Sequence, residues 1–157
     1  MSLDLKGETH MDHLVGMLYS AVNENYSRLI SIVSDMSQQE IDYKGPNQTY
    51  NSTAQLIRHL AYVDLNWIFR IKGEPIPKQL EEKYGPTLDQ NNKIPFISGV
   101  SLKQILTDYE EVFRLNHTVD YEAEKQATIQ WGIRHMADHN RYHQAHIHQL
   151  RKWFEEK

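Results

Sequence analysis

This 157-residue sequence contains no cysteine, so neither a disulfide nor a thiolate metal site can form within the chain. Any metal ion would have to be held by nitrogen and oxygen ligands. Any sulfur nucleophile would have to be supplied by a small molecule. The absence of cysteine also fits a reducing cytosol, and we expect a cytoplasmic protein.

Long apolar runs and an excess of basic residues are missing as well. No segment approaches the roughly 20 apolar residues that a membrane span needs, and residues 1–10 lack the apolar centre of a signal peptide. The formal net charge is −4, whereas proteins that bind nucleic acids usually carry a basic surplus. We therefore expect neither a membrane nor a nucleic-acid partner.

Several catalytic signatures are absent. The chain carries no Glu-x-x-His pair of the kind that di-iron bundles place on two helices, and no His-Glu-x-x-His zinc-protease motif. It also has neither a glycine-rich phosphate loop nor a Gly-x-Ser-x-Gly elbow. These absences exclude the chemistries that depend on those motifs.

Amphipathic periodicity dominates what is present. Apolar residues recur at three- and four-residue steps, which predicts helices, over residues 10–36, 53–72, 102–119 and 124–154. Asn51 or Ser52 could cap the second helix, Gly73 would end it, and Ser101 would cap the third. Strand signals are weak throughout.

A long connection, residues 73–99, separates the second and third helices and suggests a functional crossover or lid. The length of the chain fits one domain, so we expect residues 1–157 to form a single all-α domain. The predicted architecture is an antiparallel four-helix bundle with a long crossover connection.

Histidine is unusually concentrated near the end of the chain. Five of the nine histidines fall between His135 and His148. On a helical wheel four of them share a sector of roughly 80° with the apolar residues, and His148 points the other way. We therefore expect these four to lie on the buried face: His135, His139, His143 and His146.

Buried imidazoles must satisfy two ring nitrogens each, which is costly in an apolar core. A metal ion relieves that cost, because each ring gives a lone pair to the ion. The i, i+4 spacing of His139 and His143 lets both rings chelate one ion. His59, which falls beside Leu56 and Val63 on the wheel, is the candidate third ligand from a facing helix. Zinc, nickel, iron or cobalt would suit three imidazoles and an open position.

Other interpretations of these histidines remain open. His59 alone would usually be a core histidine with satisfied nitrogens, and an HxxxH pair can arise by chance in a histidine-rich helix. His146 competes as a ligand because it lies three residues after His143, while His135 fits a second-layer or cavity position better.

The remaining candidates have simpler interpretations. The other histidines are expected at the surface or near the terminus: His10, His13, His117 and His148. The tryptophans Trp67, Trp131 and Trp153 are expected to pack in the core or at the bundle ends. Asp64 and Asp138 could orient ligands or move protons, or could simply be solvated.

The chain resembles the DinB/YfiT-like family of metal-dependent enzymes. Residues 53–67 look like the family helix that carries its first histidine, and residues 135–147 look like its last helix. That helix usually ends close to His-x-x-Tyr-His-Arg-Gly-Gln-Ile. The present sequence departs from this ending, with Gln144, Ala145 and His146 in place of Arg-Gly-Gln. The pocket wall is therefore expected to differ from that of the family, because Ala145 adds a methyl group where glycine would allow close packing.

The resemblance implies a metal triad at His59, His139 and His143, with zinc, nickel or iron as the divalent ion. It further implies a cytoplasmic homodimer that acts on a small-molecule substrate. Relatives include transferases that use low-molecular-weight thiols such as bacillithiol or mycothiol, and also isomerases and hydrolases. The resemblance therefore favours a metal-dependent thiol transferase, with a hydrolase that uses metal-bound water, or a non-catalytic metal- or ligand-binding stress-response protein, as alternatives.

Overall fold

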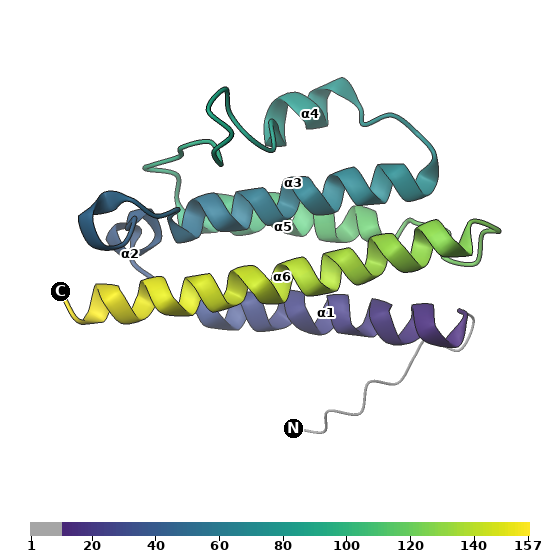
Figure 1. The fold of residues 1–157 in the computed structure, drawn as a ribbon, viewed down its shortest axis with the longest axis horizontal. Coiled ribbons are helices and arrows are strands. Elements are labelled where there is room, and N and C mark those ends of the chain that lie inside the picture. Colours follow the sequence, from purple (N-terminus) through teal and green to yellow (C-terminus); the bar gives the residue numbers. More distant parts are fainter. Residues whose placement is uncertain (1–10) are drawn as a thin grey trace.

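The computed structural model describes residues 11–157, and all regular secondary structure in that part of the chain is helical (Figure 1). Four long helices lie side by side: α1 (His13–Val33), α3 (Thr53–Lys72), α5 (Leu102–Asn116) and α6 (Gln126–Glu155). Helices α3 and α5 run in one direction and α1 and α6 run in the other, so the long crossover joins two parallel helices. The predicted all-α bundle is confirmed. The expected surface position of His10 lies outside the described residues.

Helix α1 begins where the Asp12 side chain accepts hydrogen bonds from the backbone N–H groups of Leu14 and Val15. Its apolar stripe buries Val22, Leu29 and Val33, as the periodicity predicts. Leu14 and Met17, however, are exposed. They lie in the first two turns.

Helix α3 has the predicted bounds because both of its ends are fixed by local chemistry. Ser52 and Gln55 form a capping box, each side chain accepting a hydrogen bond from the backbone N–H of the other. Gly73 ends the helix with φ 70°, a left-handed conformation that glycine adopts without strain. This helix is almost entirely enclosed, because it packs against both α5 and α6.

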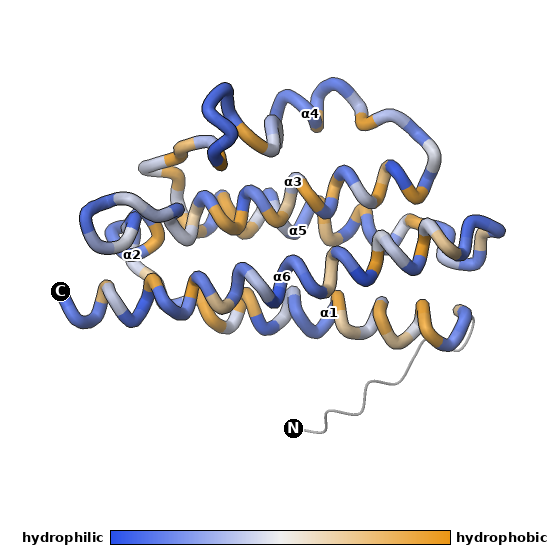
Figure 2. Tube along the Cα trace, viewed as in Figure 1, coloured by the Kyte–Doolittle hydropathy of each residue, from blue (hydrophilic) through white to orange (hydrophobic). Residues whose placement is uncertain are grey.

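The core lies between the four long helices, and α1 packs mainly on α6. Figure 2 shows apolar and polar positions alternating along each helix, as expected where one side is buried. Gly132 of α6 lies close against α3, since a Cβ there would come within 2.8 Å of Ile71 Cδ1 and 2.9 Å of Trp67 Cε3. The fully buried large side chains include Leu29, Ile57, Leu60, Leu65, Ile68, Ile129, Ile133, Met136 and Ile147.

Short helices occupy two connections that the sequence leaves as loops. Helix α2 (Gln38–Asp42) follows α1, and α4 (Lys78–Tyr84) lies in the long crossover, beyond α3 in Figure 1. Tyr84 fixes α4 to α5, because its buried hydroxyl contacts the Asp108 carbonyl and a Glu111 carboxylate oxygen. None of the helices within residues 11–157 is long and apolar enough to cross a membrane.

Candidate metal centre

Three histidine rings from two helices meet inside the bundle. His59 projects from α3, and His139 and His143 project from successive turns of α6. The Nε2 atom of His139 lies 3.2 Å from that of His59 and 2.9 Å from that of His143. One ring nitrogen from each of the three residues lies within 4.8 Å of the other two. The structure thus brings together the three residues that the wheel and the family resemblance select.

This convergence fits a cation better than it fits hydrogen bonding. The Nε2 atom of a neutral imidazole is either a donor or an acceptor, so His139 Nε2 cannot form a full hydrogen bond with both neighbours at once. Two ligand nitrogens on a tetrahedral ion, each about 2.0–2.1 Å from it, would lie ~3.3 Å apart. The separations of 3.2 Å and 2.9 Å are close to that value, and all three nitrogens lie within 4.8 Å of one another, so the three side chains could hold one divalent ion.

The electrostatics of the cluster favour neutral rings. Burial, followed by the adjacent His59 and His135, lowers the pKa of His139 to about 4. Burial and the neighbouring rings likewise lower the pKa of His143 to about 3. Burial also lowers the pKa of His59, against the opposing effect of a hydrogen bond to the backbone of Thr87. At neutral pH the rings therefore offer lone pairs rather than positive charges.

His146 contacts the His143 ring on the side that faces away from His59 and His139. Its Nδ1 lies 3.3 Å from Nδ1 of His143, the nitrogen that does not face the other ligands. If His143 donates its Nδ1–H to His146, its Nε2 keeps the lone pair that a metal requires. This geometry places His146 behind His143, away from the point where the three Nε2 atoms meet.

The wheel overestimated the burial of the outer histidines. His143 is buried and His139 is half-buried, but His135 and His146 are exposed, so the expectation that all four would be buried is wrong. His135 still touches the cluster, because its ring stacks on that of His139 with centroids 5.3 Å apart. On its other side, the His135 ring centroid lies 5.4 Å from that of Trp67.

The other surface expectations are mostly confirmed. His13, His117 and His148 are exposed. Among the tryptophans, Trp67 and Trp153 are half-buried, whereas Trp131 is 67% exposed, contrary to the expectation of packing.

The two aspartates differ from each other. Asp138 is solvated and pairs with Arg134 one turn earlier on α6. Asp64 is buried, and burial raises its pKa to about 8 although Tyr109 lies within hydrogen-bonding distance, 3.4 Å from Oδ2. Asp64 therefore holds its proton at neutral pH.

A chain of buried polar side chains runs beside the triad, and sequence reasoning missed it. Asn140 donates from Nδ2 to the Tyr109 hydroxyl at 2.7 Å, and Gln144 donates from Nε2 to Asn140 Oδ1 at 2.7 Å. Gln144 Nε2 also lies 2.9 Å from the backbone carbonyl of Asn25. Asn140 and Gln144 directly follow the two α6 histidines, so these bonds fix the turn that carries the rings. The signal available in the sequence was an i, i+4 amide pair in the apolar sector.

Ala145 does not affect helix packing. The residue is exposed, so its methyl group meets no facing helix, while its neighbour Gln144 is buried and hydrogen-bonded. The departure from the usual family ending therefore matters through His146 rather than through Ala145.

Two openings adjoin the cluster. A slot of about 190 Å³ lies on the His146 side, between α3 and the end of α6. Its walls include Tyr50, Leu56, Leu150 and Trp153. A narrow gap beside His59 is roofed by the crossover at Pro86 and Thr87. His146 lines the first opening and His59 lines the second.

Comparison with known proteins gives consistent results. A family model described as the DinB superfamily matches residues 21–147. A Bacillus subtilis (strain 168) protein, "Uncharacterized protein YkkA", is 44% identical over 95% of this chain and 93% of its own length. No solved structure matches the sequence significantly.

Proposed function

This chain belongs to the DinB superfamily, and from that premise we propose that it is an enzyme that uses one divalent ion held by His59, His139 and His143. The convergence of three neutral Nε2 atoms supports the proposal. Zinc, nickel or iron would suit such a site. The bound ion would lower the pKa of a small thiol or a water molecule, which supplies a nucleophile at neutral pH.

We propose thiol transfer as the reaction. The chain has no cysteine, so the sulfur would arrive with a low-molecular-weight cosubstrate. The apolar slot beside His146 offers a wall of Tyr50, Leu56 and Trp153 for an electrophilic substrate. His146 would hold the His143 ring in the required tautomer. A homodimer, which the resemblance implies, is part of the same proposal.

Two alternatives use the same cluster. A hydrolase would activate water in place of a thiol and would need no cosubstrate. A metal- or ligand-binding stress-response protein would hold the ion without turnover. The half-exposed rings of His59 and His139 favour an open site over a closed structural one.

The metal assignment is tested by elemental analysis of protein purified without an affinity column. We expect near one divalent ion per chain, and its loss in His59→Ala and His143→Ala with helical circular dichroism retained. His148→Ala is the matched control, because that residue is exposed on the same helix and has no place in the cluster. Full metal content in a His59→Ala/His143→Ala double variant would disprove the assignment.

The reaction is tested with a model electrophile and a panel of small thiols. We expect a thiol to accelerate loss of the electrophile in the metal-loaded protein, and the His143→Ala variant to lose that acceleration. Turnover without any thiol would favour the hydrolase. Metal binding without turnover under either condition would favour the binding protein.

A further inference from the structure

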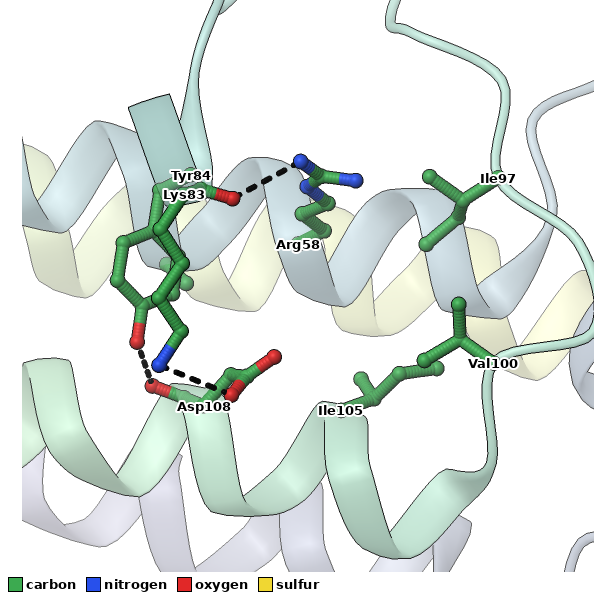
Figure 3. A pocket seen from close by; sticks show the side chains of 8 residues that line it. Arg58, Lys83, Tyr84, Ile97, Val100, Ile105 and Asp108 are labelled. Carbon is green, nitrogen blue, oxygen red and sulfur yellow. Dashed lines mark hydrogen bonds and ion pairs between the residues drawn. The ribbon is translucent and has the colours of Figure 1, made fainter. Parts of the chain in front are cut away.

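A second cavity lies between α3, α5 and the crossover, whereas the histidine cluster lies between α3 and α6. Figure 3 shows it from close by, and its volume is about 130 Å³. One side is apolar, and the other carries charged and polar groups. The lining residues are Ala61, Ile97, Val100 and Ile105 on the apolar side, and Arg58, Lys83, Tyr84 and Asp108 on the polar side.

The Arg58 guanidinium has unused donors in this cavity. Its Nη2 donates to the backbone carbonyl of Lys83 at 2.9 Å. Within residues 11–157 no carboxylate pairs with it. A guanidinium carries five N–H donors in a fixed fork that matches a carboxylate. In Figure 3 the fork lies at the upper edge of the cavity, with one nitrogen directed away from Lys83.

Asp108 offers the complementary charge on the opposite side. Its Oδ1 is occupied by Lys83 Nζ at 3.2 Å and by Gln104 Nε2 at 2.8 Å. No ion pair or hydrogen bond of the described chain occupies its Oδ2, which Figure 3 shows on the cavity side of α5. Arg58 and Asp108 face one cavity without pairing with each other.

We propose that this cavity binds a small aliphatic α-amino acid. The ligand carboxylate would pair with Arg58, the ammonium with Asp108, and the side chain would pack on Ile97, Val100 and Ile105. The site goes beyond the metal-dependent reaction and does not rest on it, because none of its residues belongs to the histidine triad.

Charge balance favours a zwitterion over an ion of one sign. Lys83 pairs with Asp108 and with Glu111 at 2.6 Å, so the two cations around the cavity are matched by two carboxylates. An anion alone would leave Asp108 facing it, and a cation alone would face Arg58. Desolvating an unpaired charge is costly, whereas a zwitterion pairs both ends.

The volume of the cavity limits the size of the side chain that the bound amino acid can carry. A volume of about 130 Å³ suits a ligand near the size of alanine or valine and is too small for an aromatic amino acid. An acidic side chain would bring a second negative charge toward Asp108 and Glu111. Small aliphatic side chains are therefore the class that fits both the walls and the charges.

The test uses the full-length protein with isotope-labelled isoleucine and valine methyl groups, titrated with L-valine and L-alanine. We expect saturable shifts at Ile97, Val100 and Ile105, with no change at Ile129 or Ile147 of α6. Propionate and propylamine, which each lack one charge, should bind at least tenfold more weakly, and L-phenylalanine should not bind. Absence of saturable shifts, or equal binding by propionate or propylamine, would overturn the proposal.

Variants separate this site from the metal centre. Arg58→Gln and Asp108→Asn should each weaken L-valine binding at least tenfold. The control variants Arg28→Gln, at a half-buried residue of α1, and Asp120→Asn, at an exposed residue, should not weaken it. His139→Ala should leave L-valine binding unchanged; loss of binding there would show that the amino acid binds the metal centre instead.

A further variant tests the cavity without changing its charge. Val100→Phe should block L-valine by filling the space from the crossover, and retained binding in that variant would place the ligand elsewhere.

Discussion

Lowering the pH from 7.5 to 5.5 should barely change the contribution of His139 and His143 to metal affinity. Protons compete with a metal only at rings that become protonated. Their pKa values are about 4 and about 3, so at pH 5.5 roughly 97% of His139 rings and nearly all His143 rings remain neutral. The proton penalty from these two residues is therefore small.

Ordinary imidazoles would behave differently. With a pKa of about 6.5, roughly ten rings in eleven are neutral at pH 7.5 but only about one in eleven at pH 5.5. Two such ligands would together weaken metal binding roughly a hundredfold. The pKa of His59 is also lowered, so we expect that ligand to contribute less than its full factor of about ten.

The assay is competition for zinc against a chromophoric chelator that is calibrated separately at each pH. We expect the apparent affinity of the protein to fall by less than about tenfold across this range. His148→Ala, exposed on the same helix, should give the same profile. A fall of a hundredfold or more would show that the rings titrate as in water, and would refute the argument that burial keeps them neutral.

Two further changes test the surroundings of the site. Gly132→Ala should lower the free energy of unfolding by ~1 kcal/mol in denaturant titrations. The new methyl group would meet Ile71 and Trp67, and such overpacking costs about 1–3 kcal/mol, whereas the higher helix propensity of alanine returns only about 1 kcal/mol. An unchanged or higher stability would refute this close packing. The pKa of Asp64 is 3.8 in the unfolded chain and about 8 in the folded chain. Between these two pH values the folded chain keeps a proton that the unfolded chain has lost, so the free energy of unfolding falls as the pH rises. The stability of Asp64→Asn relative to the unmodified protein should therefore increase from pH 4 to pH 8, and an equal difference at both pH values would contradict the buried protonated carboxyl.

Local signals predicted the helix that carries His59 completely. The Ser52–Gln55 capping box and the left-handed Gly73 act within a few residues of the helix ends. By contrast, α2 and α4 have only five and seven residues, too few for a periodic pattern to stand out.

The sequence predicted which side of α6 carries the histidines, but not how deeply each one is buried. A wheel places His135 and His146 in the same sector as His143, yet it does not say how far a neighbouring helix covers each turn. Trp131 is exposed for the same reason. The burial of Asp64 was also not predictable from local sequence, because its neighbour Tyr109 is 45 residues away along the chain. Such long-range contacts are absent from any local pattern.

Two of the three proposed metal ligands lie on adjacent turns of one helix, and this placement limits how the sequence can change during evolution. A single insertion or deletion between His139 and His143 would rotate one ring by ~100° about the α6 axis and dismantle the cluster, even if every residue type were kept. The crossover between α3 and α5 is under no such restriction, because it carries none of the three histidines. Across homologues, gaps should therefore accumulate in the crossover and be absent from the stretch between the two histidines.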